Sequence, residues 1–369
     1  MLLQEHKQLF EQTTQIKAIF KNGQRVWPTV VPDYSEPFYV ENIRSSVQTL
    51  SIVKTSSYAP TLTIEYSTDK SQWTQFENPT STTAITLDLQ PGDKVYLRCE
   101  TERFCIGGGV NNISGVSKVG GNIMSLLYGS SFTGRETTFK STNGYVFNNL
   151  FSGINRILTD ASELLLPALT LTTSCYDSMF YNCLSLRTAP ALPATTLASG
   201  CYGNMFNGCG SLITAPKLPA TTLALSCYYQ MFELCYNLTA APTLPATTLA
   251  DSCYYRMFYN CNRLTAAPAL PATTLANNCY QSMFSYCTSL VTSPVLAAPT
   301  LVQNCYRGMF ERCRNLVNIT CLATDRSAQN ATASWLYNAS TTGTFTKATG
   351  VEWPTGTSGI PEGWTVVEV

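Results

Sequence analysis

A 26-residue repeat constrains this chain more than any other feature of its 369 residues. A Cys-Tyr pair recurs every 26 residues from Cys175 to Cys305 without insertion, and a second cysteine follows eight residues after the first. Met-Phe lies between the two cysteines, and a leucine follows three residues past the second one. One unit holds too few apolar residues to enclose a core, so successive units must stack and share a continuous interior.

Two segments of the unit carry different signals. After the second cysteine comes A-P-x-L-P-A-T-T-L, as in the stretch ending at Leu197. Its prolines predict a short, irregular strand, because proline cannot donate to a ladder. In Cys-Tyr-x-x-Met-Phe-x-x-Cys the apolar residues have helical spacing, and Ser or Asn before the first cysteine suits a helix start. We therefore expect an α/β solenoid of six 26-residue coils over residues 171–320.

The repeat resembles a known family. L-x-x-A-P-x-L-P-A-T-T-L-A-x-x-C-Y-x-x-M-F-x-x-C is similar to the BspA-like leucine-rich repeat of Bacteroidetes surface proteins, with Met-Phe where that family has Ala-Phe and with longer coils. Similar arrays occur in gut Bacteroides proteins and in Bacteroides (crAss-like) phages, often ending in a segment like Gly359–Trp364. The resemblance covers roughly residues 122–369. It implies a leucine-rich-repeat fold used for adhesion or partner binding, and it fixes no ligand.

Twelve of the fifteen cysteines are repeat positions. Eight-residue spacing without histidine is a poor match to zinc sites. A disulfide within one unit needs Cα atoms within about 7 Å, whereas eight helical residues span about 12 Å. We expect buried free thiols that act as small apolar ladder residues. Bridging between coils remains an alternative, and Cys99 and Cys105 could pair with each other.

The chain before the repeat divides into three segments. Residues 36–105 alternate apolar and polar side chains between turn signals, which predicts a small all-β sandwich, similar to immunoglobulin or fibronectin modules, with Trp73 and Phe76 in its core. Residues 106–170 are glycine-rich and predict a linker and N-terminal cap with an irregular first coil around Leu150-Phe151. Residues 1–35 are too few for a domain. They predict an arm that docks on a partner through Phe10, Phe20 and Trp27.

The 26-residue period is lost after residue 320. Residues 321–369 predict a C-terminal cap that covers the last coil. The residues expected to cover the last coil are aromatic: Trp335, Phe345, Trp353 and Trp364.

Composition excludes several classes of function. The net charge is zero and only 12% of residues are charged, which argues against a nucleic-acid partner. His6 is the single histidine, so histidine-based catalysis and most metal sites are excluded. Apolar stretches are too short to insert in a membrane, and the N-terminal residues do not resemble a signal peptide. We expect no catalytic residues, no metal and no cofactor: the protein is not an enzyme.

The copies differ from one another at a few positions, which are those two, three, six, seven and nine residues after the first cysteine. Tyr, Asn, Ser, Gly and Arg dominate there, as they do in antibody-type binding surfaces. Drift at exposed positions is the competing explanation. The ligand-binding hypothesis names Tyr181, Tyr229, Tyr236, Tyr255, Arg256, Tyr259, Tyr286 and Arg307.

These features favour a binding protein. Adhesion-type repeats without a signal peptide suit a phage virion protein, which is assembled in the host cytoplasm and released by lysis. The arm would then contact other virion proteins, and the repeats would contact a host surface protein or glycan; a homo-oligomer is possible. The alternative is a bacterial cell-surface adhesin of the BspA-like kind.

Overall fold

The computed structural model describes residues 19–21, 24–27, 33–54, 62–76, 84–104, 111–135, 139–153 and 157–369. The chain forms two compact parts, Met1–Tyr34 and Ser35–Val369. In the first part, β1 (Ile19–Lys21) pairs antiparallel with β2 (Gln24–Trp27). The docking hypothesis for Phe10, Phe20 and Trp27 concerns side chains outside the described residues.

The second part begins with two β-sheets that share a core. The larger sheet has the order β11-β10-β3-β8-β5-β6, and in the smaller one β4 lies between β7 and β9. Along β4, Leu50 and Ile52 are buried on the inner face, as the alternation predicts. The strands are β3 (Tyr39–Glu41), β4 (Gln48–Lys54), β5 (Ile64–Ser67), β6 (Thr74–Gln75), β7 (Ile85–Leu89), β8 (Lys94–Cys99), β9 (Asn111–Ser114), β10 (Lys118–Asn122) and β11 (Asp160–Leu165).

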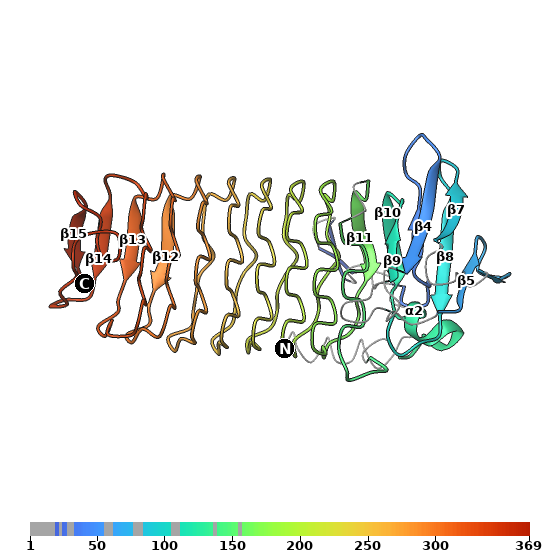
Figure 1. The fold of residues 1–369 in the computed structure, drawn as a ribbon, viewed down its shortest axis with the longest axis horizontal. Helices are drawn as coiled ribbons and strands as arrows, with labels where there is room; N and C mark the ends of the chain where they lie inside the picture. Colours follow the sequence, from blue (N-terminus) through green and yellow to red (C-terminus); the bar gives the residue numbers. More distant parts are fainter. Residues whose placement is uncertain are drawn as a thin grey trace. The chain divides into compact units, whose positions relative to one another are not determined.

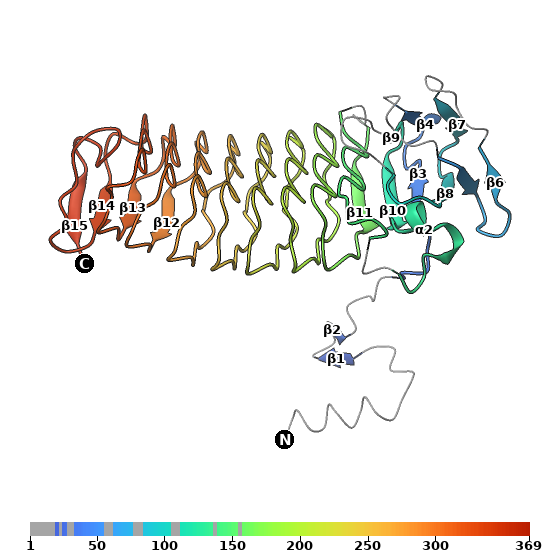
Figure 2. The same ribbon diagram turned by 60° about the horizontal axis from the view of Figure 1, so that its bottom comes forward.

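Strands β9 and β10 correct the expectation of a linker over residues 106–170. β10 pairs antiparallel with β3 and parallel with β11, so the first sheets continue directly into the repeats (Figure 2). The glycines of β10 serve close packing, because a Cβ at Gly120 would lie 2.3 Å from the Tyr39 ring. The segment also holds α2 (Ser125–Tyr128) and the 3-10 helix η1 (Gly129–Ser131).

Trp73 and Phe76 are only half-buried, not core residues as expected. The Arg98 guanidinium lies over the Trp73 ring at 4.0 Å, and Phe76 stacks on Tyr66 at 4.4 Å. The Trp73 ring therefore lies with Arg98 on the outer face of the sheet, whereas Phe76 and Tyr66 are partly buried against the edge of the core.

Each repeat unit contains a turn segment, which we define as the residue before the first cysteine through the second cysteine (174–183 in the first unit). Alternate amides donate to the next unit, as Tyr176 N does to the Cys201 carbonyl at 3.0 Å. The amides in between donate three residues back, as Asp177 N does to the Ser174 carbonyl. The segment is thus a chain of β-turns linked to its neighbours on either side.

The helix predicted for this segment is wrong. Ser174, Ser178 and Asn182 have φ of 48°, 55° and 57°, so every fourth residue is left-handed, which no α-helix allows. Ser and Asn before the first cysteine are therefore left-handed turn residues and not helix caps. Spacing of i, i+1, i+4, i+5 and i+8 also fits a period of four, which over so short a stretch mimics a helical one.

Stacked side chains of identical type form the interior. Phenylalanine rings follow one another from Phe151 to Phe310 at centroid distances of 5.2–5.7 Å, and a second column runs from Tyr176 to Tyr306 at 5.8–6.0 Å. The fourteen described cysteines are free and buried. The second cysteine of each unit donates its S–H to a phenylalanine carbonyl of the preceding unit, as Cys235 does to Phe206 at 3.2 Å.

The proline-rich side of the units forms mostly isolated parallel bridges, such as Thr214 with Ala240 and Thr222 with Thr248. This agrees with the expectation of irregular strands, since proline removes ladder donors. A regular parallel sheet appears only toward the C-terminal end (Figure 1). It consists of β12 (Thr292–Leu296), β13 (Asn318–Cys321), β14 (Thr344–Lys347) and β15 (Thr365–Glu368).

The turn backbone extends beyond the six sequence copies at both ends. Before them, Phe147 N donates to the Cys175 carbonyl, and Asn149 is left-handed. After them, Phe310 N donates to the Trp335 carbonyl, and Trp335 stacks on Tyr306 at 6.4 Å. Residues 330–338 therefore continue the units, although the region was expected to be only a cap.

The regular elements of the described residues are strands apart from one short α-helix and one 3-10 helix, in a repetitive, β-rich fold with a parallel four-stranded sheet. None of its described helices has the length and apolar character that crossing a membrane requires.

Candidate ligand-binding surface

The turn segment sorts its side chains into an inner and an outer set. The two cysteines and the Tyr, Met and Phe positions are at most 2% exposed in all six units. The outer set alternates with these buried residues. Its side chains lie two and three residues, and six and seven residues, after the first cysteine. The outer surface made by these positions and by the two residues after the second cysteine is called the turn face below.

Backbone conformation accounts for much of the residue preference on the turn face. The positions three and seven after the first cysteine are left-handed in every unit, a conformation that Asn and Gly adopt most readily. The abundance of Asn, Ser and Gly there is thus not in itself a sign of a binding surface. The large residues that occupy the same positions are more informative: Gln230, Leu234, Arg256, Tyr286 and Arg312, with φ of 50–63°.

Four of these large residues and their neighbours form one cluster across the third to sixth units, which we call the ridge. The Arg256 guanidinium lies 3.0 Å from the Glu233 carboxylate and 3.9 Å from the Tyr259 ring centroid. Tyr259 contacts Tyr286 at 5.2 Å between centroids, and the Arg312 guanidinium lies 5.0 Å from the Tyr286 ring. The ridge consists of Gln230, Glu233, Arg256, Tyr259, Tyr286 and Arg312.

Glu233 anchors one end of the ridge. It is 7% exposed, accepts a hydrogen bond from Gln230 and pairs with Arg256. Burial raises the pKa of its carboxyl, against the opposing effects of the Arg256 charge and the Gln230 hydrogen bond. Because both partners are engaged, the pair orients the Arg256 side chain along the surface and stacks it on Tyr259.

Tyr229 and Tyr255 form a second feature beside the ridge. Their rings are half-buried, 4.9 Å apart and nearly parallel at 4°. On one side of this pair the equivalent position is Gly203, which has no side chain. The pair therefore forms a small aromatic step on the turn face.

The structure brings together Tyr229 with Tyr255, and Arg256 with Tyr259 and Tyr286. It places Tyr181, Tyr236 and Arg307 elsewhere on the turn face as separately exposed side chains. Gln230, Glu233 and Arg312 were missed by the sequence hypothesis, which weighted tyrosine. A signal was present, since a large or charged residue replaces Asn, Ser or Gly of other units at those positions.

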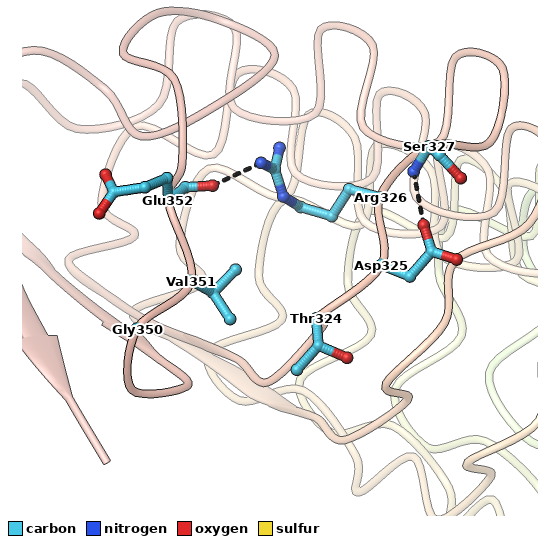
Figure 3. Close-up of a pocket in the computed structure, with 7 residues that line it drawn as sticks. All are labelled: Thr324, Asp325, Arg326, Ser327, Gly350, Val351 and Glu352. Atoms are coloured by element: carbon cyan, nitrogen blue, oxygen red, sulfur yellow. Dashed lines mark hydrogen bonds between the residues drawn. The ribbon is translucent and has the colours of Figure 1, made fainter.

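A second candidate lies near the C-terminal end, where a shallow depression is lined by Thr324, Asp325, Arg326, Ser327, Gly350, Val351 and Glu352 (Figure 3). The Arg326 guanidinium donates to the Glu352 carbonyl and lies 4.3 Å from the Trp353 ring. The Asp325 carboxylate accepts from Ser327 N at 3.0 Å. The ridge spans four units and combines two guanidinium groups with two aromatic rings, so it is the stronger candidate. The described residues contain no cluster of three metal-ligating side chains.

Comparison of the chain with protein-family models, curated proteins and solved structures finds no match.

Proposed function

We propose that this chain is a non-enzymatic binding protein whose units form a leucine-rich-repeat solenoid of the BspA-like kind, with turns in place of helices, and whose turn face contacts the ligand. One observation carries the proposal: Arg256, Tyr286 and Arg312 occupy left-handed positions, where a large side chain costs about 1–2 kcal/mol relative to glycine. Glycine avoids this strain at the equivalent positions of two units, Gly208 and Gly308, and bulky residues kept in a strained conformation are a sign of function. Charge clusters such as Glu233 with Arg256 suit recognition better than acid–base catalysis.

We further propose that the protein is a phage virion component, fibre-like, with an immunoglobulin- or fibronectin-like sandwich between the arm and the repeats. Fourteen buried free thiols support folding in a reducing cytoplasm, because export in an unfolded state to an oxidising compartment would expose them to disulfide formation. The arm would dock on other virion proteins, and the turn face would attach to a host surface protein or glycan.

A substitution experiment tests the binding proposal. Tyr229, Tyr255 and Tyr259 are replaced together by serine, and binding of the labelled protein to host cells is measured by flow cytometry. The control replaces three exposed tyrosines outside the six turn segments, Tyr34, Tyr145 and Tyr337, by serine. We expect at least a tenfold loss for the first variant, since aromatic anchors carry much of an interface, and little for the control. Equal binding by both variants would refute a role for this surface.

Location is tested separately. Mass spectrometry of gradient-purified virions should find the protein at a constant ratio to the capsid protein. Recovery in the outer-membrane fraction of uninfected cells would instead support the cell-surface adhesin.

A further inference from the structure

Charge is distributed unevenly along the units. Between Cys253 and Leu316 the chain has five arginines, no lysine and one carboxylate, that of Glu311, whereas the whole chain is neutral. Between Cys175 and Ser252 three acidic residues outnumber two basic ones. The five arginines of the fourth to sixth units are Arg256, Arg263, Arg307, Arg312 and Arg314.

All five arginines lie on the turn face. They follow the first cysteine of their unit by two, three, seven, nine or ten residues, and none is on the proline-rich side. Arg263, Arg307 and Arg314 are exposed. Neither Arg307 nor Arg314 has an ion pair with a described residue, while Arg256 and Arg312 each have one carboxylate partner. Positive charge therefore remains uncompensated on this part of the surface.

Guanidinium groups flank a pair of aromatic rings on this surface. Tyr259 and Tyr286 lie between Arg256 on one side and Arg312 on the other. Arginine forms paired hydrogen bonds with carboxylate, sulfate or phosphate oxygens. Tyrosine offers an apolar ring for a sugar and a hydroxyl for its polar groups. Units repeat here at the 5.6 Å spacing of the Phe258 and Phe284 ring centroids, close to the length of one sugar residue in an extended chain.

We propose that the turn face of the fourth to sixth units binds an anionic polysaccharide. The arginines contact its carboxylate or sulfate groups, and Tyr259 and Tyr286 contact its sugar rings. This inference rests on the proposed binding function and specifies the ligand class. A repeating ligand matches a repeating surface, because successive units present the same kinds of group at a constant rise.

Polymers of one backbone test the inference. The full chain is titrated by biolayer interferometry with immobilised dextran, carboxymethyl dextran and dextran sulfate, and with poly-L-glutamate as an acidic polypeptide. We expect binding to carboxymethyl dextran, dextran sulfate or both, and not to dextran. The affinity should fall as salt increases, because ions screen exposed charges. The relative affinities for the two charged dextrans distinguish carboxylate from sulfate as the preferred group.

Arg307→Gln with Arg314→Gln removes two exposed charges without disturbing a described ion pair. The matched control, Arg187→Gln with Lys217→Gln, removes two exposed charges from the first two units. We expect about a tenfold loss of affinity for the charged dextran in the first variant and less than a twofold change in the control. Equal losses in both variants, equal binding to neutral dextran, or stronger binding to poly-L-glutamate would overturn the inference.

The two proposals fail in distinguishable ways. If the tyrosine variant loses cell binding but charged dextrans do not bind, the turn face binds a different ligand class and only this inference is wrong. If neither the tyrosine variant nor the arginine variant differs from the native chain on host cells, the proposed binding function of the turn face is wrong.

Discussion

The two cysteines of the third unit allow the role of the thiol ladder to be measured by one pair of substitutions. Cys227 and Cys235 are both fully buried, so Cys→Ala removes the same atom from a similar environment. Cys235 differs in one respect: its S–H donates to the Phe206 carbonyl at 3.2 Å. That carbonyl also accepts from Cys209 N at 3.0 Å, so the substitution removes one of its two partners.

The expected cost follows from these contacts. Deleting a buried group the size of a methyl costs about 1 kcal/mol, which is the value expected for Cys227→Ala. Losing an internal hydrogen bond adds about 0.5–1 kcal/mol, at the low end because thiols are weak donors. Cys235→Ala should therefore lower the free energy of unfolding by about 1.5–2 kcal/mol.

Urea unfolding followed by circular dichroism measures both variants under identical conditions. Because the two sites lie in one unit, both substitutions act on the same part of the cooperative structure. If Cys227→Ala lowers the free energy of unfolding as much as Cys235→Ala, or more, the hydrogen bond has no measurable role. The thiols would then stabilise the fold only by packing in the interior.

Three further predictions concern titration and backbone conformation. Burial raises the pKa of Asp177 from 3.8 to about 6, so its ionisation lowers the free energy of unfolding as the pH rises through this range. Thermal melting should therefore show Asp177→Asn to be more stable than the native chain by about 1–3 kcal/mol at pH 8 and equally stable near pH 3.5. Burial raises the pKa values of Cys201 and Cys253 to about 12, so the free energy of unfolding should fall above about pH 9. The thiols of the folded protein should also resist Ellman's reagent at pH 8, and rapid labelling without unfolding would contradict this. Asn260 has φ of 62°, so Asn260→Gly should be tolerated while Asn260→Ala costs about 1 kcal/mol in urea unfolding; the reverse order would refute the left-handed assignment.

Parts of the fold could be predicted from local patterns. Alternation along β4 placed Leu50 and Ile52 in the interior, because a strand has a period of two whatever surrounds it. The glycines of β10 predicted a linker, but the segment is a strand. Gly120 is required there because the ring of Tyr39, a residue far away in the sequence, lies against it. Contacts of that kind cannot be recognised before the strands are placed.

The candidate site was only partly predictable. Comparison of the units identified Tyr229, Tyr255 and Tyr259 as variable outer positions. It did not show that Glu233 orients Arg256, because that contact joins different positions of neighbouring units. It also could not separate Asn and Gly chosen for the backbone from residues chosen for a ligand.

The 26-residue period is enough to establish that the units repeat, that they share an interior and that the cysteines are part of this interior. An uninterrupted 26-residue period leaves equivalent side chains little alternative to stacking on one another. Contacts between units explain why the segment from Cys175 to Cys183 forms turns and not a helix, which the pattern could not show. Alternate amides of this segment find their acceptors in the next unit, so the turn conformation becomes favourable only when that unit is in place.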